Sequence, residues 1–146
     1  MAYKTEVAVS SVADIVAARQ KGRALAMELG FEGSELTMMA TAISEIARNI
    51  VDHAKHGTIT FSSIHQSRTR GILIVAKDDG PGIRDVSQAM QYGFSSRNGL
   101  GVGLPGAKWL MDDFNIKSRV GKGTVVTMKK WLHHDQLDRN ENGAGN

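Results

Sequence analysis

The glycine-rich stretch GLGVGLPG, residues 99–106, decides which fold classes are compatible with this sequence. Gly101, Gly103 and Gly106 spell G-x-G-x-x-G, which is the fingerprint of a dinucleotide-binding βαβ unit. That unit needs a buried strand just before the motif and an acidic residue about 20 positions after it. Here the motif follows GFSSRN, and the corresponding downstream window reads GKGTVV, which contains no acid. The sequence therefore excludes a Rossmann fold.

Two other glycine signatures are also missing. A P-loop needs G-x-x-x-x-G-K-[ST], but Ala107 follows Gly106, and the H-R-D and D-F-G motifs of ordinary protein kinases are absent. Leu104 and Pro105 instead open an apolar helical pattern directly after the alternating glycines. A glycine loop that enters a helix N-terminus presents free N–H groups to an anion. The stretch is thus either a phosphate site or a flexible surface loop.

The composition predicts one globular domain without thiol chemistry. The chain has 146 residues, of which 41% are hydrophobic and 23% charged, and it contains no cysteine. No apolar run approaches the about 20 residues of a membrane span, and the N-terminus lacks a signal-peptide core. We therefore expect a cytoplasmic protein with no membrane partner. A net charge of +3 and 5% aromatic residues, without a basic cluster, give no indication of nucleic-acid binding.

Hydrophobic periodicity and turn residues predict the order βααββααββ. Strands are expected at 4–10, 58–64, 71–77, 114–120 and 124–132, and helices at 11–29, 34–56, 85–92 and 104–113. This order fits neither a parallel α/β sheet nor an all-β protein. It predicts an α/β (α+β) two-layer sandwich, with helices on one face of a mainly antiparallel mixed sheet. We expect one domain over 1–132 and a polar, disordered tail over 133–146.

A polar stripe on the expected helix 34–56 is the first group of candidate functional residues. It lies opposite the apolar face and contains Glu45, Asn49, Asp52 and His56. Such a stripe is commonly only a solvated helix face. However, a carboxylate and a carboxamide one turn apart can also serve a hydroxyl nucleophile and a hard metal ion. The helix alone leaves both interpretations open.

Two further segments combine glycine with polar residues. KDDGPGI, residues 77–83, follows an apolar strand and is either a turn or a ligand site. In a ligand site, the acid at the strand end would accept a hydrogen bond from an amino group. Gly80 and Gly82 would then let a flat base approach closely. GKGT, residues 121–124, indicates a β-hairpin turn.

Taken in order, the motifs resemble those of a known superfamily. E-x-x-x-N, D-x-G-x-G, G-x-G-x-G and G-x-G-T resemble the N, G1, G2 and G3 boxes of the ATPases typified by gyrase, Hsp90, histidine kinases and MutL. Within this GHKL superfamily, ISEIARNIVDHA and DDGPGI…GFSS…GLGVGLPGAKWLMDDF are similar to the RsbT-type serine/threonine switch kinases of the bacterial stressosome. The likeness spans residues 11–132. It implies the Bergerat ATP-binding fold, in which the glycine stretch lines a lid over the phosphates.

The resemblance assigns a role to each matching residue. It implies that Glu45 is the general base that takes the proton from a substrate Ser or Thr hydroxyl, and that Asn49 is a Mg²⁺ ligand. It places Asp78 against the adenine amino group, with Gly82 beneath the base and Thr124 helping through its hydroxyl or a water.

The resemblance also assigns the phosphate contacts. It implies that Gly99, Gly101 and Gly103 offer backbone N–H groups to phosphate oxygens. Arg97 and Lys108 are the nearest cations that could neutralise phosphate, although Lys108 could equally be a solvated residue at the edge of an apolar helix.

The resemblance implies an enzyme that uses ATP and Mg²⁺. Its expected activity is phosphorylation of STAS-domain regulatory proteins on Ser or Thr in a bacterial stress-signalling partner switch, with a downstream phosphatase as a further partner. The alternative is an ATP-binding anti-sigma factor that acts mainly as a protein-binding module. The ATPase part of a topoisomerase or repair machine is disfavoured because such proteins carry further domains. A histidine-kinase fragment is disfavoured because a phospho-acceptor helix would precede it.

Overall fold

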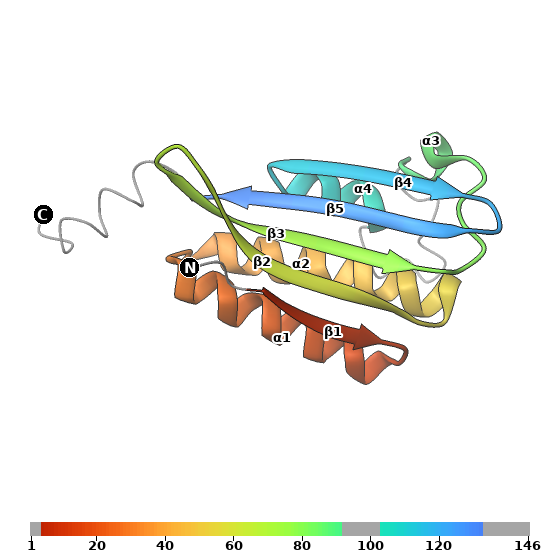
Figure 1. Ribbon diagram of the computed structural model, residues 1–146, viewed down its shortest axis with the longest axis horizontal. Helices are drawn as coiled ribbons and strands as arrows, with labels where there is room; N and C mark the ends of the chain where they lie inside the picture. Colours follow the sequence, from red (N-terminus) through yellow and green to blue (C-terminus); the bar gives the residue numbers. More distant parts are fainter. Residues whose placement is uncertain (1–3, 92–102, 133–146) are drawn as a thin grey trace, which may run out of the picture.

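A single antiparallel sheet forms one layer of the protein. The computed structural model describes residues 4–91 and 103–132, so the expected tail 133–146 lies outside the described residues. The sheet has five strands in the order β1-β2-β3-β5-β4, and every neighbouring pair is antiparallel (Figure 1). The strands are β1 (Lys4–Val9), β2 (Gly57–Gln66), β3 (Thr69–Asp78), β4 (Asp113–Arg119) and β5 (Gly123–Trp131).

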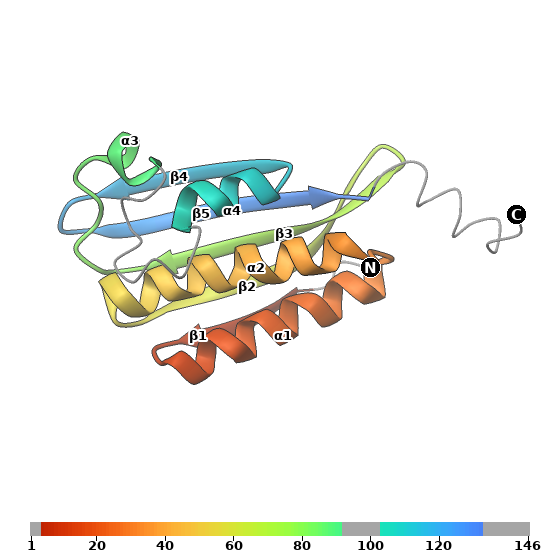
Figure 2. The same ribbon diagram turned by 180° about the vertical axis from the view of Figure 1, so that it is seen from behind.

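Helices cover one face of this sheet. Figures 1 and 2 show α1 (Val12–Leu29), α2 (Ser34–Asn49) and α4 (Gly103–Leu110) on the same side, while the short α3 (Val86–Ala89) lies at one end. The predicted two-layer α+β sandwich is therefore confirmed. None of the helices in the described part of the chain is both long and apolar enough to cross a membrane.

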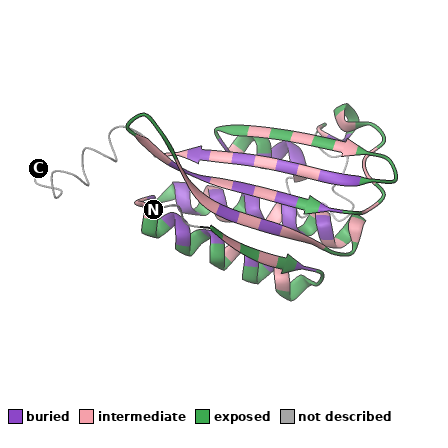
Figure 3. Cartoon of the chain, viewed as in Figure 1, coloured by how far each residue is buried: buried purple, intermediate pink, exposed green. Residues whose placement is uncertain are grey.

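Alternation along the strands builds the core between the two layers. Successive side chains of a strand point to opposite faces, and Figure 3 shows buried residues alternating with more exposed ones along the inner strands. A register slip of one residue would turn the inward set to solvent, so the core fixes the strand pairing. The fully buried inward side chains include Ile59, Phe61, Ile72, Ile74 and Met128 from the strands, and Met39, Ile43 and Ile46 from α2.

The expected helix 34–56 is not one continuous α-helix. The α-helix ends at Asn49, and residues Ile50–Ala54 form a π-helical turn, η1. The N–H of Lys55 donates to the carbonyl of Ile50 at 2.9 Å, which closes the wider i→i+5 turn. The predicted spacing is therefore wrong beyond Asn49. Glu45 and Asn49 are half-buried, whereas Asp52 and His56 are exposed and do not continue their face.

The C-terminal end of α4 is anchored to the sheet by hydrogen bonds and an ion pair. The Nζ of the buried Lys130 on β5 donates to the carbonyl oxygen of Leu110 at 2.9 Å and lies 3.8 Å from the carboxylate of Asp112. The N–H of Asp112 already donates to the carbonyl of Lys129 on β5, at 3.0 Å. The helix therefore ends at Leu110, before the predicted residue 113.

Candidate functional site

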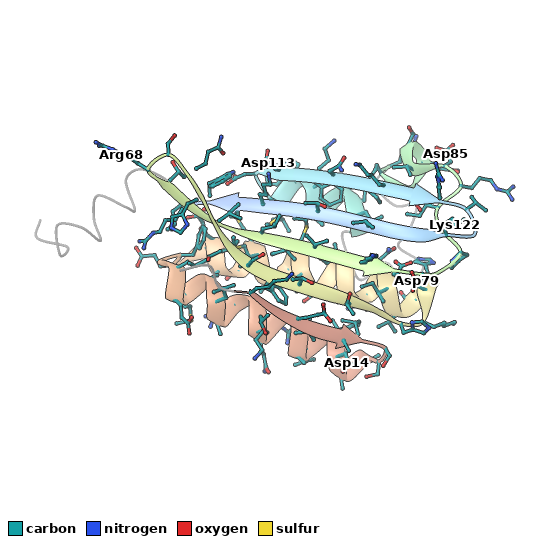
Figure 4. All side chains as sticks on the ribbon, in the orientation of Figure 1. Asp14, Arg68, Asp79, Asp85, Asp113 and Lys122 are labelled. Atoms are coloured by element: carbon teal, nitrogen blue, oxygen red, sulfur yellow. The ribbon has the colours of Figure 1, made fainter. Side chains whose placement is uncertain are left out.

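The candidate site lies at the end of the sheet where β3 ends and β5 begins. The labelled side chains of Asp79, Asp85 and Lys122 gather at this end in Figure 4, and Arg68 lies at the opposite end. Three of the segments singled out from the sequence meet here: the C-terminal part of α2, the loop after Asp78, and the β4–β5 hairpin. The topology thus brings distant motifs together.

Glu45 lies between α2 and the start of α4. Its side chain is half-buried, and its Oε2 accepts a hydrogen bond from the backbone N–H of Gly103 at 3.1 Å. Gly103 is the first residue of α4 and has φ 67°, a left-handed conformation that favours glycine. The structure therefore joins the predicted catalytic carboxylate to the last of the predicted phosphate-binding glycines.

A cleft opens beside Asn49, the last residue of α2. Its volume is about 490 Å³, which is within the usual range for small-molecule sites. The cleft is framed by the end of α2, the loop after β3, α3 and the start of α4. Its lining residues are Asn49, His53, Pro81, Gly82, Ile83, Arg84, Asp85, Gln88, Ala89 and Leu104.

The loop after β3 begins at Asp78 and packs against the π-helical turn at Gly80. Asp78 is 9% exposed, and its Oδ1 accepts a hydrogen bond from the N–H of Gly80 at 2.9 Å. A Cβ on Gly80 would lie only 2.6 Å from the Cβ of Ala54 in η1. Glycine is therefore required here, because the loop passes directly against the end of the π-helical turn.

The next residues of the loop are held on the β4–β5 hairpin. Gly82 has φ 78°, and a Cβ there would collide with the carbonyl oxygen of Arg119. The carbonyl of Pro81 accepts a hydrogen bond from the N–H of Gly121 at 2.8 Å. The N–H of Ile83 donates to Ser118 Oγ at 2.7 Å. The β4–β5 hairpin thus supports the loop that forms one wall of the cleft.

Thr124 is buried at the start of β5, directly opposite Asp78 in the strand pairing. Its Oγ1 lies 2.7 Å from Ser118 Oγ. The predicted GKGT turn is confirmed, with Gly121 at φ 81° and Gly123 at φ 123°. Sequence reasoning missed Ser118. Its signal was the hairpin register, because Ser118 and Thr124 are paired across that turn.

The remaining candidates divide into two groups. Gly99, Gly101 and Arg97 lie outside the described residues. Lys108 is exposed on α4 and is not among the described residues that line the cleft. The lining residues that sequence reasoning missed include Arg84, which follows the D-x-G-x-G motif, and His53, which lies four positions after Asn49. The spacing of His53 from Asn49 was the signal that could have identified it.

The donor set favours a metal ion that arrives with phosphate. Within residues 4–91 and 103–132, no group of three or more His, Cys, Asp or Glu residues could hold a metal. On α2, the carboxamide of Asn49 and the carboxylate of Glu45 supply two oxygen donors one turn apart. Mg²⁺ commonly takes one or two protein oxygens and completes its shell with phosphate and water. The residues fit such an ion, and they do not form an all-protein cage.

Comparison with known proteins agrees with this arrangement. The family model for the histidine kinase-like ATPase domain matches residues 8–130. Serine/threonine-protein kinase RsbT of Bacillus subtilis (strain 168) is 49% identical over 119 residues, which cover 82% of this chain and 90% of that protein. Anti-sigma F factor of Thermoanaerobacter sp. (strain X514) is 32% identical over 125 residues, which cover 82% of this chain and 86% of that protein.

A solved structure supports the same fold. The crystal structure of the RsbU and RsbW domains of a Mycobacterium tuberculosis protein aligns with a TM-score of 0.60 at 17% identity. The alignment covers 91% of this chain and 33% of that one, so this chain spans about a third of its length. The chain therefore belongs to the histidine kinase-like ATPase domain family, as a homologue of the serine/threonine-protein kinase RsbT.

Proposed function

We propose that this protein is a cytoplasmic kinase that transfers the γ-phosphoryl group of ATP to Ser or Thr of STAS-domain regulatory proteins in a stress-signalling partner switch. Membership of the ATPase family implies ATP binding, and similarity to RsbT supports the kinase activity. The contact that carries the residue-level proposal is the hydrogen bond from Gly103 to Glu45, next to Leu104, which lines the cleft. A downstream phosphatase is a further proposed partner.

The adenine is proposed to lie against the end of β3. The carboxylate of Asp78 would accept a hydrogen bond from the amino group, with Thr124 beside it in the sheet. Gly80 and Gly82 hold the loop after Asp78 close against η1 and the β4–β5 hairpin, because a Cβ at either position would collide with those elements.

The phosphates are proposed to lie at the N-terminus of α4. Backbone N–H groups of Gly99, Gly101 and Gly103 would donate to their oxygens, and the helix dipole favours an anion there. Among the cations, Arg84 lines the cleft, while Arg97 and Lys108 stay weaker candidates for neutralising phosphate. A bound Mg²⁺ would neutralise phosphate charge, with Asn49 as its protein ligand.

Phosphoryl transfer is proposed to proceed with Glu45 as the base. The acceptor hydroxyl oxygen forms a bond to the γ-phosphorus, the bond from that phosphorus to the bridging oxygen breaks, and ADP leaves. The hydroxyl proton passes to the Glu45 carboxylate, a contribution typically worth ~10²–10⁴-fold in rate. Since Gly103 N–H donates to Glu45 in this structure, we expect a phosphate oxygen to replace the carboxylate on that N–H when ATP binds.

The substitution Glu45→Gln tests this proposal. It keeps the shape of the side chain and the acceptor oxygen for Gly103, but it removes the base. Phosphotransfer from labelled ATP to a purified STAS-domain protein should fall by ~10²–10⁴-fold, while binding of ATP and of that protein persists. Glu28→Gln, an exposed carboxylate on α1, is the matched control. Phosphotransfer at the wild-type rate in Glu45→Gln would show that the general-base assignment is wrong.

The alternative function is a binding module of the anti-sigma type, supported by the 32% identity to anti-sigma F factor. The same preparations distinguish the two. A wild-type protein that binds STAS-domain partners tightly but never phosphorylates them would favour the binding module. In either case Asn49→Ala should weaken magnesium-dependent nucleotide binding, because it removes the proposed protein ligand of the ion.

A further inference from the structure

Ser118 occupies a junction between the loop after β3 and the β4–β5 hairpin. Its half-buried Oγ accepts a hydrogen bond from the N–H of Ile83 at 2.7 Å and donates to the carbonyl of Gly123 at 3.2 Å. The third neighbour is the hydroxyl of Thr124, at 2.7 Å. Ser118 is thus a side chain that joins two segments of the proposed adenine site.

A backbone carbonyl can only accept, so we assign the single Ser118 proton to Gly123, and this assignment determines the direction of the third hydrogen bond. A serine hydroxyl carries one proton and two acceptor lone pairs. When the Ser118 hydroxyl donates to the Gly123 carbonyl, one lone pair of Ser118 Oγ accepts the N–H of Ile83. The other lone pair accepts the hydroxyl proton of Thr124. This assignment satisfies every hydrogen-bonding position of Ser118. Thr124 Oγ1 can then act only as a hydrogen-bond acceptor toward any other partner.

Thr124 and Asp78 then form a pair of neighbouring acceptors. They face each other across the β3–β5 pairing, and they are 5% and 9% exposed. Gly123 keeps the two strands close, because a Cβ there would collide with the carbonyl of Asp78. Adenine presents an exocyclic amino group with two donor hydrogens, whereas guanine presents the carbonyl oxygen O6 at the equivalent position. Two acceptors side by side therefore suit adenine.

We propose that Ser118 is a positioning residue that holds Thr124 as an acceptor and thereby makes the site select adenine over guanine nucleotides. The inference rests on the nucleotide site of the proposed function. In wild-type protein, guanine O6 would meet two acceptors and find no donor. Without the Ser118 hydroxyl, the Thr124 proton is free to turn and donate to O6.

The test compares the dissociation constants of Mg·ADP and Mg·GDP by calorimetry. The wild type should prefer ADP, and Ser118→Ala should reduce the ADP-over-GDP preference by about five- to tenfold, the effect of one hydrogen bond. Ser118→Thr keeps the hydroxyl and should keep the preference. A purely structural role would lower the melting temperature and both affinities together, but it would not change their ratio.

Thr124→Val provides a second route that leaves Ser118 intact. It should also reduce the ADP-over-GDP preference, and adding Ser118→Ala to it should change the ratio no further, because Ser118 acts through Thr124. An unchanged ratio in Ser118→Ala, or in Thr124→Val if the first variant does not fold, overturns the inference. A wild-type protein that binds neither nucleotide overturns the proposed function as well. Normal ADP binding with an unchanged ratio overturns only the role of Ser118.

Discussion

At the scale of single residues, two adjacent carboxylates occupy different environments. Asp78 is buried at the end of β3, whereas Asp79 is exposed. Asp78→Asn keeps an Oδ1 acceptor for the N–H of Gly80 but presents an amide N–H₂ to the adenine amino group. We expect calorimetry with a non-hydrolysable ATP analogue to show at least about tenfold weaker binding. Asp79→Asn is the matched control and should bind normally. Undiminished binding by Asp78→Asn would remove that residue from the site.

Gly103 permits a second prediction at this scale. At φ 67° an alanine is strained, and its Cβ would obstruct a phosphate at the start of α4. Gly103→Ala should therefore weaken the binding of ATP more than the binding of adenosine in the same titration. The control is Gly121→Ala, where φ is 81° but the space around a Cβ is open. In this variant the ratio of the ATP affinity to the adenosine affinity should not change. Equal losses of both ligands in Gly103→Ala would mean that the loop has only a structural role.

At the scale of elements, the start of α1 depends on one carboxylate. Asp14 Oδ2 accepts hydrogen bonds from the N–H groups of Ser10 and Ser11, at 2.8 and 3.1 Å. The bond from the Ser10 N–H is the main cause that lowers the pKa of Asp14 below its ordinary 3.8. A lowered folded-state pKa stabilises the fold above the unfolded value, and this stabilisation is lost as the pH falls through the folded value.

The substitution Asp14→Asn should therefore lower stability at neutral pH. Urea unfolding followed by circular dichroism should give a lower midpoint than for the wild type at pH 7, and the difference should shrink as the pH falls below 3.8. Glu28→Gln, at the other end of α1, should not lower the midpoint. A difference that stays constant down to acidic pH would contradict the role of the ionised carboxylate.

The anchoring of α4 gives another prediction at this scale. Lys130→Met keeps the buried stem but removes the donor to the carbonyl of Leu110 and the charge beside Asp112. Hydrogen bonds from charged groups contribute about 1.5–3 kcal/mol, so unfolding free energy should fall by roughly 2 kcal/mol in denaturant titrations. Lys129→Met is the control, because Lys129 is less buried on the neighbouring position of β5. Equal stability of Lys130→Met and wild type would show that α4 is anchored by other contacts.

Most elements could be predicted from the sequence because their signals are local. The strands follow two-residue alternation, and α1 lies between the capping residues Ser11 and Gly30. The π-helical turn Ile50–Ala54 could not be predicted, since the 100° periodicity assumes a continuous α-helix and places Asp52 beside Asn49. The turn packs against Gly80, which lies far away in the sequence. The turn therefore depends on tertiary packing, which local periodicity does not record.

At the scale of the whole molecule, the candidate site depends on contacts between distant segments. The sequence motifs located Glu45 and Asp78, which the structure places at the same end of the sheet. The hydrogen bonds from Gly103 to Glu45 and from Ile83 to Ser118 could not be predicted, because they depend on how the helices and the hairpin pack. A resemblance to a family gives residue roles, and the geometry of the complete fold gives the neighbours through which those residues act.

The layered packing itself can be tested at Gly22 of α1. A Cβ at this position would collide with Cδ1 of Ile43 on α2 and would lie 2.8 Å from Phe61 on β2. Alanine gains about 1 kcal/mol of helix propensity over glycine, but overpacking a core typically costs about 1–3 kcal/mol. Gly22→Ala should therefore lower the unfolding free energy overall.

The double variant Gly22→Ala/Ile43→Val makes this prediction specific. Ile43→Val removes the colliding Cδ1 and alone should cost about 0.5–1.5 kcal/mol by leaving a small cavity. Together the two changes should be less destabilising than the sum of the single variants, because the new methyl group fills the vacated space. Urea unfolding of the wild type and the three variants measures this coupling. Strictly additive losses would show that α1 moves away from α2 and the sheet to accommodate the methyl group, and that these layers are not rigidly packed at Gly22.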